Sequence, residues 1–124
     1  MLLTLERPDH DYFLRGADGQ SALVNDRRLT ESFVLAPDTL LERWPVTDAR
    51  TLSAEQLQPL LALSPEVILL GCGAIQVFPP AATLAACLSR GIGLEVMTNA
   101  AAARTFNVLA GEGRRVVAGF ILNP

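Results

Sequence analysis

The stretch VILLGCGAI, residues 67–75, runs four apolar residues into two glycines that flank a cysteine. An uninterrupted apolar run of this kind is typical of a strand that is covered on both faces of a sheet. Many phosphate-binding loops begin with a glycine-rich turn after such a strand, and this turn also carries a thiol. The stretch therefore predicts a buried strand and leaves three roles open for the turn: nucleotide binding, a nucleophilic cysteine, or close packing.

Helical patterns lie on both sides of this strand. Ser53 and Gln56 have the spacing of a capping box, and they open a helix that Pro59 keeps short or kinked. Pro79-Pro80 suits the entry to a second helix, and Gly91 is placed to end it. The predicted apolar face of the second helix contains Ala81, Leu84, Cys87 and Leu88.

Two more strands and a third helix follow. GLEVM, residues 93–97, predicts a strand, and Asn99 can cap a helix over residues 100–110. Phe106 falls on the buried stripe of this helix. VVAGFIL, residues 116–122, predicts a last strand that is covered on both faces.

The first third of the chain shows strand patterns without helices. DYFLR (11–15) and SALVN (21–25) flank a turn whose Asp18-Gly19 pair can supply a positive φ. SFVLA (32–36) predicts another strand, whereas residues 37–52 show no clear period and are expected to form a long connection. Together the patterns predict an α/β fold, a single three-layer domain over residues 1–124 with an N-terminal antiparallel β portion.

Composition and charge exclude several classes of function. The chain has 124 residues, half of them hydrophobic, and a formal net charge of -3. Its 10 basic residues are all arginines without a basic cluster, so nucleic acid is not an expected partner and a P-loop lysine is absent. Neither a signal peptide nor an apolar run near the roughly 20 residues of a membrane helix is found, which predicts a cytoplasmic location without membrane insertion.

The residues around Cys72 favour close packing over both chemical roles. A dinucleotide fingerprint needs a third glycine where this chain has Gln76, and it needs a helix directly after the loop. A catalytic thiol needs a base or a cation beside it, and the only histidine, His10, lies in the β-rich start. One histidine and two cysteines make no zinc pattern, so no metal, NAD(P) or ATP is expected to bind.

A polar cluster surrounds the predicted third helix. Arg104 and Asn107 are three residues apart and are expected to face outward together, and Glu112, Arg114 and Arg115 follow. A solvated helix face is the favoured interpretation. The alternative is a partner-binding or anion-binding patch near the loop at Gly71–Gly73.

The C-terminal half resembles a known family. GCGAIQVFPP (71–80) and GIGLEVMTNAAAARTFNVLAGEGRRVVAGFILNP (91–124) are similar to the small-domain family that contains mitochondrial complex I assembly factor 3. The adipogenesis-associated domain protein belongs to it, as do many bacterial members known only as a domain of unknown function. The resemblance implies a central mixed β-sheet, no established catalytic residue or cofactor, and a eukaryotic relative that works by contact with other proteins.

Two positions depart from the family pattern. The loop is usually Gly-Thr-Gly, and its centre here is Cys72. The family usually has Met-Asp-Thr where this chain has Met97-Thr98-Asn99, so the aspartate that would be the most plausible acid or base is absent. This absence argues against an enzyme.

The sequence therefore predicts a bacterial, cytoplasmic, non-catalytic accessory protein, a monomer or weak homo-oligomer, that acts by protein–protein contact without a cofactor. The alternative is a small-molecule or anion-binding protein, or an enzyme, that uses the Gly71–Gly73 loop. The candidate ligand or partner surface contains Gly71, Cys72, Gly73, Asn99, Arg104 and Asn107.

Overall fold

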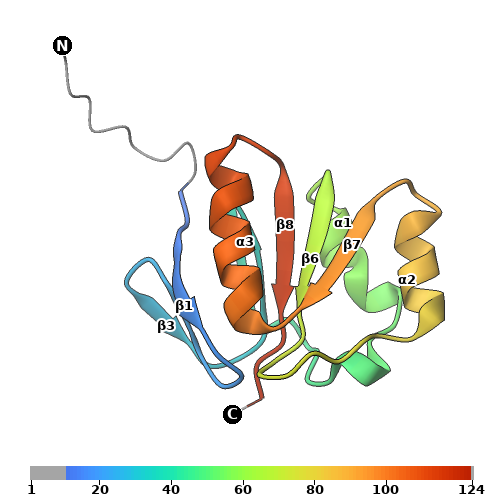
Figure 1. Ribbon diagram of the computed structural model, residues 1–124, viewed down its shortest axis with the longest axis horizontal. Helices are drawn as coiled ribbons and strands as arrows, with labels where there is room; N and C mark the ends of the chain where they lie inside the picture. The colour runs from blue at the N-terminus through green and yellow to red at the C-terminus, as the bar shows by residue number, and fades with distance from the viewer. Residues whose placement is uncertain (1–10, 124) are drawn as a thin grey trace.

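A computed structural model describes residues 11–123 and contains two β-sheets (Figure 1). The strands are β1 (Leu14–Ala17), β2 (Ala22–Val24), β3 (Arg27–Leu29), β4 (Phe33–Ala36), β5 (Thr39–Glu42), β6 (Val67–Gly71), β7 (Gly93–Met97) and β8 (Val116–Phe120). The helices are α1 (Gln58–Leu61), α2 (Ala81–Leu88) and α3 (Asn99–Gly111), with 3-10 turns η1 (Ala49–Thr51) and η2 (Glu55–Leu57).

The larger sheet is mixed and has the strand order β5-β4-β8-β6-β7. Strand β6 is parallel to both β7 and β8, whereas β4 is antiparallel to β5 and β8. Strands β1, β2 and β3 form a separate antiparallel sheet. These two sheets confirm the predicted α/β fold with a central mixed sheet and an N-terminal antiparallel portion.

Apolar side chains cover the central sheet on both faces. Along β6, Leu69 belongs to one buried cluster, whereas Ile68 and Leu70 belong to the other. The first cluster includes residues of α3 and of the small sheet, and the second includes Trp44, the η1–α1 segment and Cys87 of α2. Figure 1 shows α3 in front of the sheet, α1 behind it and α2 beyond β7. The alternation follows from the two-residue period of a strand and produces the predicted three layers.

Helix α3 is anchored by its apolar stripe, as predicted. Phe106 is fully buried in the cluster under the helix, and Arg104 is exposed. The prediction that Asn107 faces outward is wrong. Its Oδ1 accepts a hydrogen bond from the Leu14 amide (2.9 Å) and its Nδ2 donates to the Leu14 carbonyl (2.7 Å). Asn107 therefore joins α3 to β1, because both polar ends of the side-chain amide match the main chain of the strand.

The cap of α3 also differs from the prediction. Thr98, not Asn99, is the N-cap, and its side-chain oxygen accepts a hydrogen bond from the Ala101 amide at 3.3 Å. Threonine and aspartate both suit an N-cap. Thr98 is the position at which the resembled family has aspartate, so capping explains a polar residue there without acid–base chemistry.

Two polar strands were not predicted. Strand β3 begins with two arginines, and β5 lies inside residues 37–52, which the sequence assigned to a connection. The predicted turn at Asp18 is present, with the Asp18 carboxylate accepting the amides of Gln20 and Ser21. Gly19 does not adopt a positive φ there. It is required for close approach, because a Cβ on Gly19 would lie 2.9 Å from the Cβ of Ala74.

The helical segments before and after β6 differ in how well the sequence predicted them. The capping box forms as predicted, with Ser53 and Gln56 exchanging hydrogen bonds, and Pro59 sits in the first turn of the short α1. In α2 the buried side chains are Thr83 and Cys87, whereas Leu88 is exposed. The predicted face of α2 is therefore confirmed at Cys87 and wrong at Ala81 and Leu88, which are exposed. Thr83 was not predicted to face inward, and its hydroxyl donates to the Leu52 carbonyl (2.6 Å).

Among residues 11–123, no helix combines the length and apolar character needed to cross a membrane.

Candidate functional site

The loop that follows β6 is shaped by its two glycines. A Cβ on Gly71 would collide with the Oδ1 atom of Asn99, and Gly73 has a φ of +117°, which L side chains rarely adopt. Both glycines therefore have backbone and packing roles, in agreement with the interpretation favoured from the sequence.

Asn99 connects three segments that are distant in sequence. Its side chain is fully buried, and its Oδ1 accepts a hydrogen bond from the Gly73 amide at 3.2 Å. Its Nδ2 donates to the carbonyls of Asp18 (2.8 Å) and Ile121 (2.9 Å). The side chain thus ties the β1–β2 turn, the glycine loop and the end of β8 together, and its donors are already satisfied.

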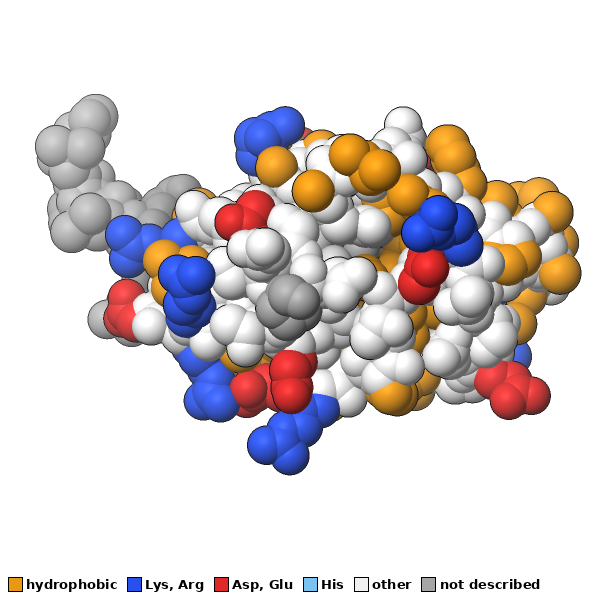
Figure 2. Space-filling model, turned by 90° about the horizontal axis from the view of Figure 1, so that it is seen from below, with side chains coloured by type: hydrophobic (Ala, Val, Ile, Leu, Met, Phe, Trp, Pro, Cys, Tyr) orange, Lys and Arg blue, Asp and Glu red, His pale blue; other side chains and the backbone are white. Residues whose placement is uncertain are grey.

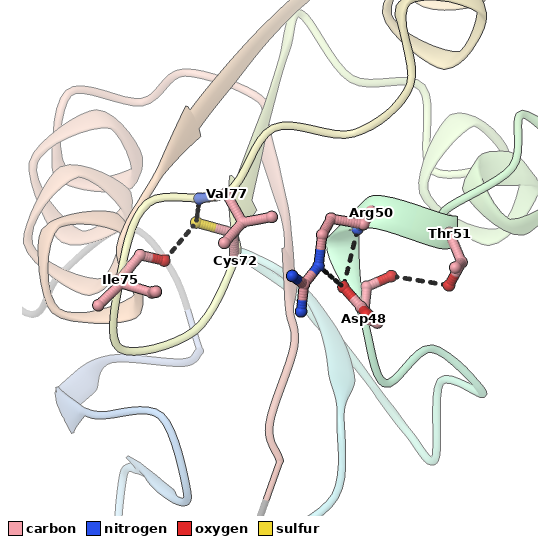
Figure 3. Close-up of polar contacts among 6 residues, drawn as sticks. All are labelled: Asp48, Arg50, Thr51, Cys72, Ile75 and Val77. Atoms are coloured by element: carbon pink, nitrogen blue, oxygen red, sulfur yellow. Dashed lines mark hydrogen bonds and ion pairs between the residues drawn. The ribbon is translucent and has the colours of Figure 1, made fainter.

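Cys72 is buried and engaged by the main chain. Its Sγ lies 3.1 Å from the Met97 carbonyl. It also lies 3.2 Å from the Ile75 carbonyl and accepts a hydrogen bond from the Val77 amide at 3.2 Å (Figure 3). The loop therefore folds back around the sulfur. His10, which the sequence placed away from Cys72, lies outside the described residues.

A hollow of about 330 Å³ opens between this loop and the start of η1. Its lining residues are Gly19, Gln20, Thr47, Asp48, Ala49, Arg50, Cys72, Gly73, Ala74, Ile75, Val77, Ile121 and Asn123. These residues come from the carboxyl ends of β6 and β8 and from the turns beside them. In open α/β sheets, ligands bind at this edge.

Arg50 is the cationic side chain among the residues that line the hollow. The Asp48 carboxylate accepts hydrogen bonds from the Arg50 amide (2.9 Å) and from its guanidinium Nε (3.2 Å). Figure 3 shows the guanidinium extending from η1 toward the loop that carries Cys72. Arg50 was not predicted as a site residue, because it lies in the segment that showed no periodicity.

The predicted site residues are only partly brought together. Gly71, Cys72, Gly73 and Asn99 lie side by side, whereas Asn107 is bonded to β1 and Arg104 is exposed farther along α3.

The proposed link between the glycine loop and the arginines after α3 is wrong. Arg115 bonds to Asp38 (2.7 Å), and its main chain exchanges hydrogen bonds with Glu66. Because β8 runs parallel to β6, residues before β8 lie beside the start of β6, whereas the glycine loop lies at its other end.

Three carboxyl groups have pKa values below the ordinary 3.8. The largest cause for Asp38 is a hydrogen bond from the Arg115 side chain, which lowers the pKa. For Asp18 the pKa is lowered most by hydrogen bonds from the Gln20 and Ser21 amides, and for Asp48 by one from the Arg50 amide. In each case the donors favour the charged form of the carboxylate. All three groups are largely or fully solvated, so their contribution to stability is small.

The folded protein is expected to lose stability in acid as these groups are protonated. Each folded pKa lies below its unfolded value, so the stabilisation is complete above the unfolded pKa and is lost as pH falls through the folded pKa. The midpoint of thermal unfolding should fall between about pH 5 and pH 2. Asp18→Asn keeps an acceptor for the turn and should show a shallower decline. An acid profile identical to that of the unaltered protein would contradict a role for Asp18.

Exposed apolar side chains gather near α2. The α2 surface comprises Ile75, Phe78, Pro80, Ala81, Ala85 and Leu88, all exposed. Ile75, Phe78 and Leu88 are 72%, 60% and 73% exposed. Figure 2 shows hydrophobic side chains collected at the right end of the molecule, where Figure 1 places α2.

No group of three or more histidine, cysteine, aspartate or glutamate residues in the described part of the chain could hold a metal ion.

Comparison with known proteins identifies relatives over most of the chain. The family described as "Protein of unknown function (DUF498/DUF598)" matches residues 14–121. A solution structure of a Xanthomonas campestris protein is 56% identical with a TM-score of 0.84, covering 98% of this chain and 92% of that one. A Bordetella pertussis protein with a Mth938-like domain is 28% identical with a TM-score of 0.79, covering 98% and 92%. A Francisella tularensis protein named "13 kDa major membrane protein" is 27% identical over 95 residues, 76% of this chain and 77% of that protein.

Proposed function

The chain belongs to the DUF498/DUF598 family of proteins of unknown function, and we propose that it is a non-catalytic accessory protein that acts by binding another protein. The proposal places the protein in the bacterial cytoplasm and gives it a role like that of an assembly factor. The resemblance to complex I assembly factor 3 supports the same kind of role.

The observation that carries the proposal is the α2 surface. Helix α2 has the sequence AATLAACL, without a charged residue, and Leu88 and Ala85 on its outer side are exposed. Ile75 and Phe78 extend the apolar character into the preceding loop. Large exposed apolar patches are rare on monomeric proteins and mark interaction sites. Burying a side chain as large as phenylalanine or leucine yields about 1.5–3 kcal/mol, so two such contacts would support specific binding.

A protein partner fits this surface better than a lipid membrane. The chain has a net charge of -3, which opposes approach to an anionic lipid surface. Residues 74–92, which contain the α2 surface, include one basic residue, Arg90, whereas interfacial membrane segments combine apolar residues with several basic ones. The Francisella relative is named a membrane protein. An experiment therefore has to distinguish binding to a protein partner from binding to a membrane.

The test is a double substitution, Phe78→Ser with Leu88→Ser, on the tagged protein. Val108→Ser is the control, because Val108 is also apolar and is as exposed as Phe78 (60%) but lies on α3. A partner captured by the unaltered protein and by the control should be lost with the double variant. With the purified partner, the double variant should bind at least about tenfold more weakly, since each tenfold change corresponds to about 1.4 kcal/mol.

Two results would overturn the proposal. The first is equal partner binding by all three proteins when their thermal unfolding midpoints agree. The second is co-sedimentation of the unaltered protein with phosphatidylethanolamine–phosphatidylglycerol vesicles in the absence of any partner, because membrane binding would then explain the α2 surface.

A further inference from the structure

We infer that the hollow beside Cys72 is a binding site for a small oxyanion, a carboxylate or phosphate group, held between the Arg50 guanidinium and the main-chain amides of the loop after Gly73. The inference goes beyond the proposed function: Ile75 borders both the α2 surface and the hollow, but Phe78 and Leu88, which test the protein contact, do not line the hollow. It also replaces Arg104, the arginine that the sequence suggested, with Arg50.

Arg50 is paired with Asp48 through one edge of its guanidinium, and the other edge is available. The Asp48 carboxylate contacts Nε at 3.2 Å, and the same Oδ1 atom accepts the Arg50 amide. The Arg50 side chain is 73% exposed, so this contact favours one direction of the guanidinium and leaves it open to solvent. Among the described residues no protein acceptor is bonded to the two terminal nitrogens of Arg50. Two parallel N–H groups of a guanidinium form the fork that matches a carboxylate or a phosphate.

The opposite wall supplies main-chain donors. The amides of Ala74, Ile75 and Gln76 have no hydrogen-bond partner within residues 11–123, whereas the amides before and after them bond to Asn99 and Cys72. Consecutive main-chain amides without partners can act together as donors to an anion. Ala74 and Ile75 line the hollow that also contains Arg50.

The balance of polar groups favours an anion over a cation. The side chains of Gln20, Thr47 and Asn123 at the hollow can all donate hydrogen bonds. Asp48 is the residue with a carboxylate among the lining residues, and this carboxylate already forms an ion pair with Arg50. A cation would therefore find a site whose acidic ligand is already paired, whereas an oxyanion would find donors on two sides.

The first test measures binding of inorganic phosphate and of acetate by NMR titration of the full chain. At least one probe should shift the amide signals of Ala74 and Ile75 in a saturable way, with a dissociation constant below about 10 mM. Arg50→Gln should weaken that binding at least about tenfold, because it removes a charge-assisted fork. Arg50→Lys keeps the charge and should fall between the two. Arg90→Gln, at an exposed arginine that does not line the hollow, is the matched control and should bind as the unaltered protein does.

A second measurement uses Cys72 as a slowly reacting reporter, because this residue lines the hollow and keeps 8% of its surface exposed. Alkylation displaces iodide from the reagent and forms a thioether, and mass spectrometry separates Cys72 from the fully buried Cys87. Iodoacetate carries a carboxylate and iodoacetamide does not, so the rate ratio of the two reagents at Cys72 reports anion binding nearby. Arg50→Gln should lower the iodoacetate-to-iodoacetamide ratio several-fold, and Arg90→Gln should leave it unchanged.

The preferred anion follows from which probe binds more tightly, and binding of either one supports the site. Absence of saturable shifts with both probes, together with a rate ratio that Arg50→Gln does not change, would overturn the inference. Shifts of equal size in the unaltered protein and in Arg50→Gln would overturn it as well. Neither result would affect the proposed protein contact, which is tested at Phe78 and Leu88.

Discussion

Replacing Asn99 with alanine is expected to lower the free energy of unfolding by about 2–4 kcal/mol, because one buried and two partly buried main-chain groups lose their partner at once. The Gly73 amide and the carbonyls of Asp18 and Ile121 are bonded to this one side chain. Each buried polar group that is left unpaired costs about 1–3 kcal/mol. The measurement is chemical denaturation of both proteins, with equal m-values as the sign that two-state unfolding is preserved.

Two further variants separate this explanation from a general effect of removing an asparagine. Asn123→Ala removes an exposed side chain at the same end of the molecule and should change stability by no more than about 0.5 kcal/mol. Asn99→Asp keeps an acceptor for the Gly73 amide but turns the donor toward Asp18 and Ile121 into an oxygen, so it should be at least as harmful as alanine. A loss below about 1 kcal/mol for Asn99→Ala would show that water or a local shift replaces the hydrogen bonds.

Phe106→Ala is expected to be comparably damaging, with a loss of about 3–5 kcal/mol. Phe106 is fully buried beneath α3, in a cluster that contains Phe33 and Phe120 stacked at a centroid distance of 4.9 Å. Removing the ring leaves a cavity that these neighbours fill only in part. A domain of this size has a total stability of about 5–15 kcal/mol, so the variant should be close to the limit of folding at 37 °C.

Arg104→Ala is the matched control for Phe106→Ala, because it lies two residues earlier on the same helix and is exposed. It should change the free energy of unfolding by no more than about 0.5 kcal/mol. A loss of several kcal/mol at Arg104 would mean that this side chain belongs to a structural network. A loss below about 1 kcal/mol for Phe106→Ala would mean that the cluster collapses around the missing ring.

The elements that sequence reasoning identified are those with a strong apolar pattern. Strands β6 and β8 and helix α3 each bury a continuous or periodic set of apolar residues, and this burial decides their structure. Strands β3 and β5 carry charged or half-exposed residues, so the alternation that signals a strand is missing. Their pairing depends on β2 and β4, which supply hydrogen-bond partners that no local pattern encodes.

The candidate site was harder to predict for a related reason. Asn99 at the start of a helix has the local signature of an N-cap, yet its partners lie 81, 26 and 22 residues away. Asn107 has the signature of a solvated helix residue, yet it bonds to a strand 93 residues away. The sequence around Arg50 has no periodicity or motif that would predict a site residue. Side-chain amides can serve a cap, a solvent face or a distant strand equally well, so only the assembled fold distinguishes these roles.

The position of β8 between β4 and β6 has a consequence for folding during synthesis. Strands β4 and β6 make no direct pairing, and each is bonded to β8 along one of its edges. A nascent chain that has been translated only as far as β7 therefore holds two incomplete half-sheets with unpaired inner edges and uncovered apolar faces. We expect these halves to join only after residues 116–120 have left the ribosome, which makes the partly translated chain the form most exposed to edge-to-edge association and to capture by chaperones.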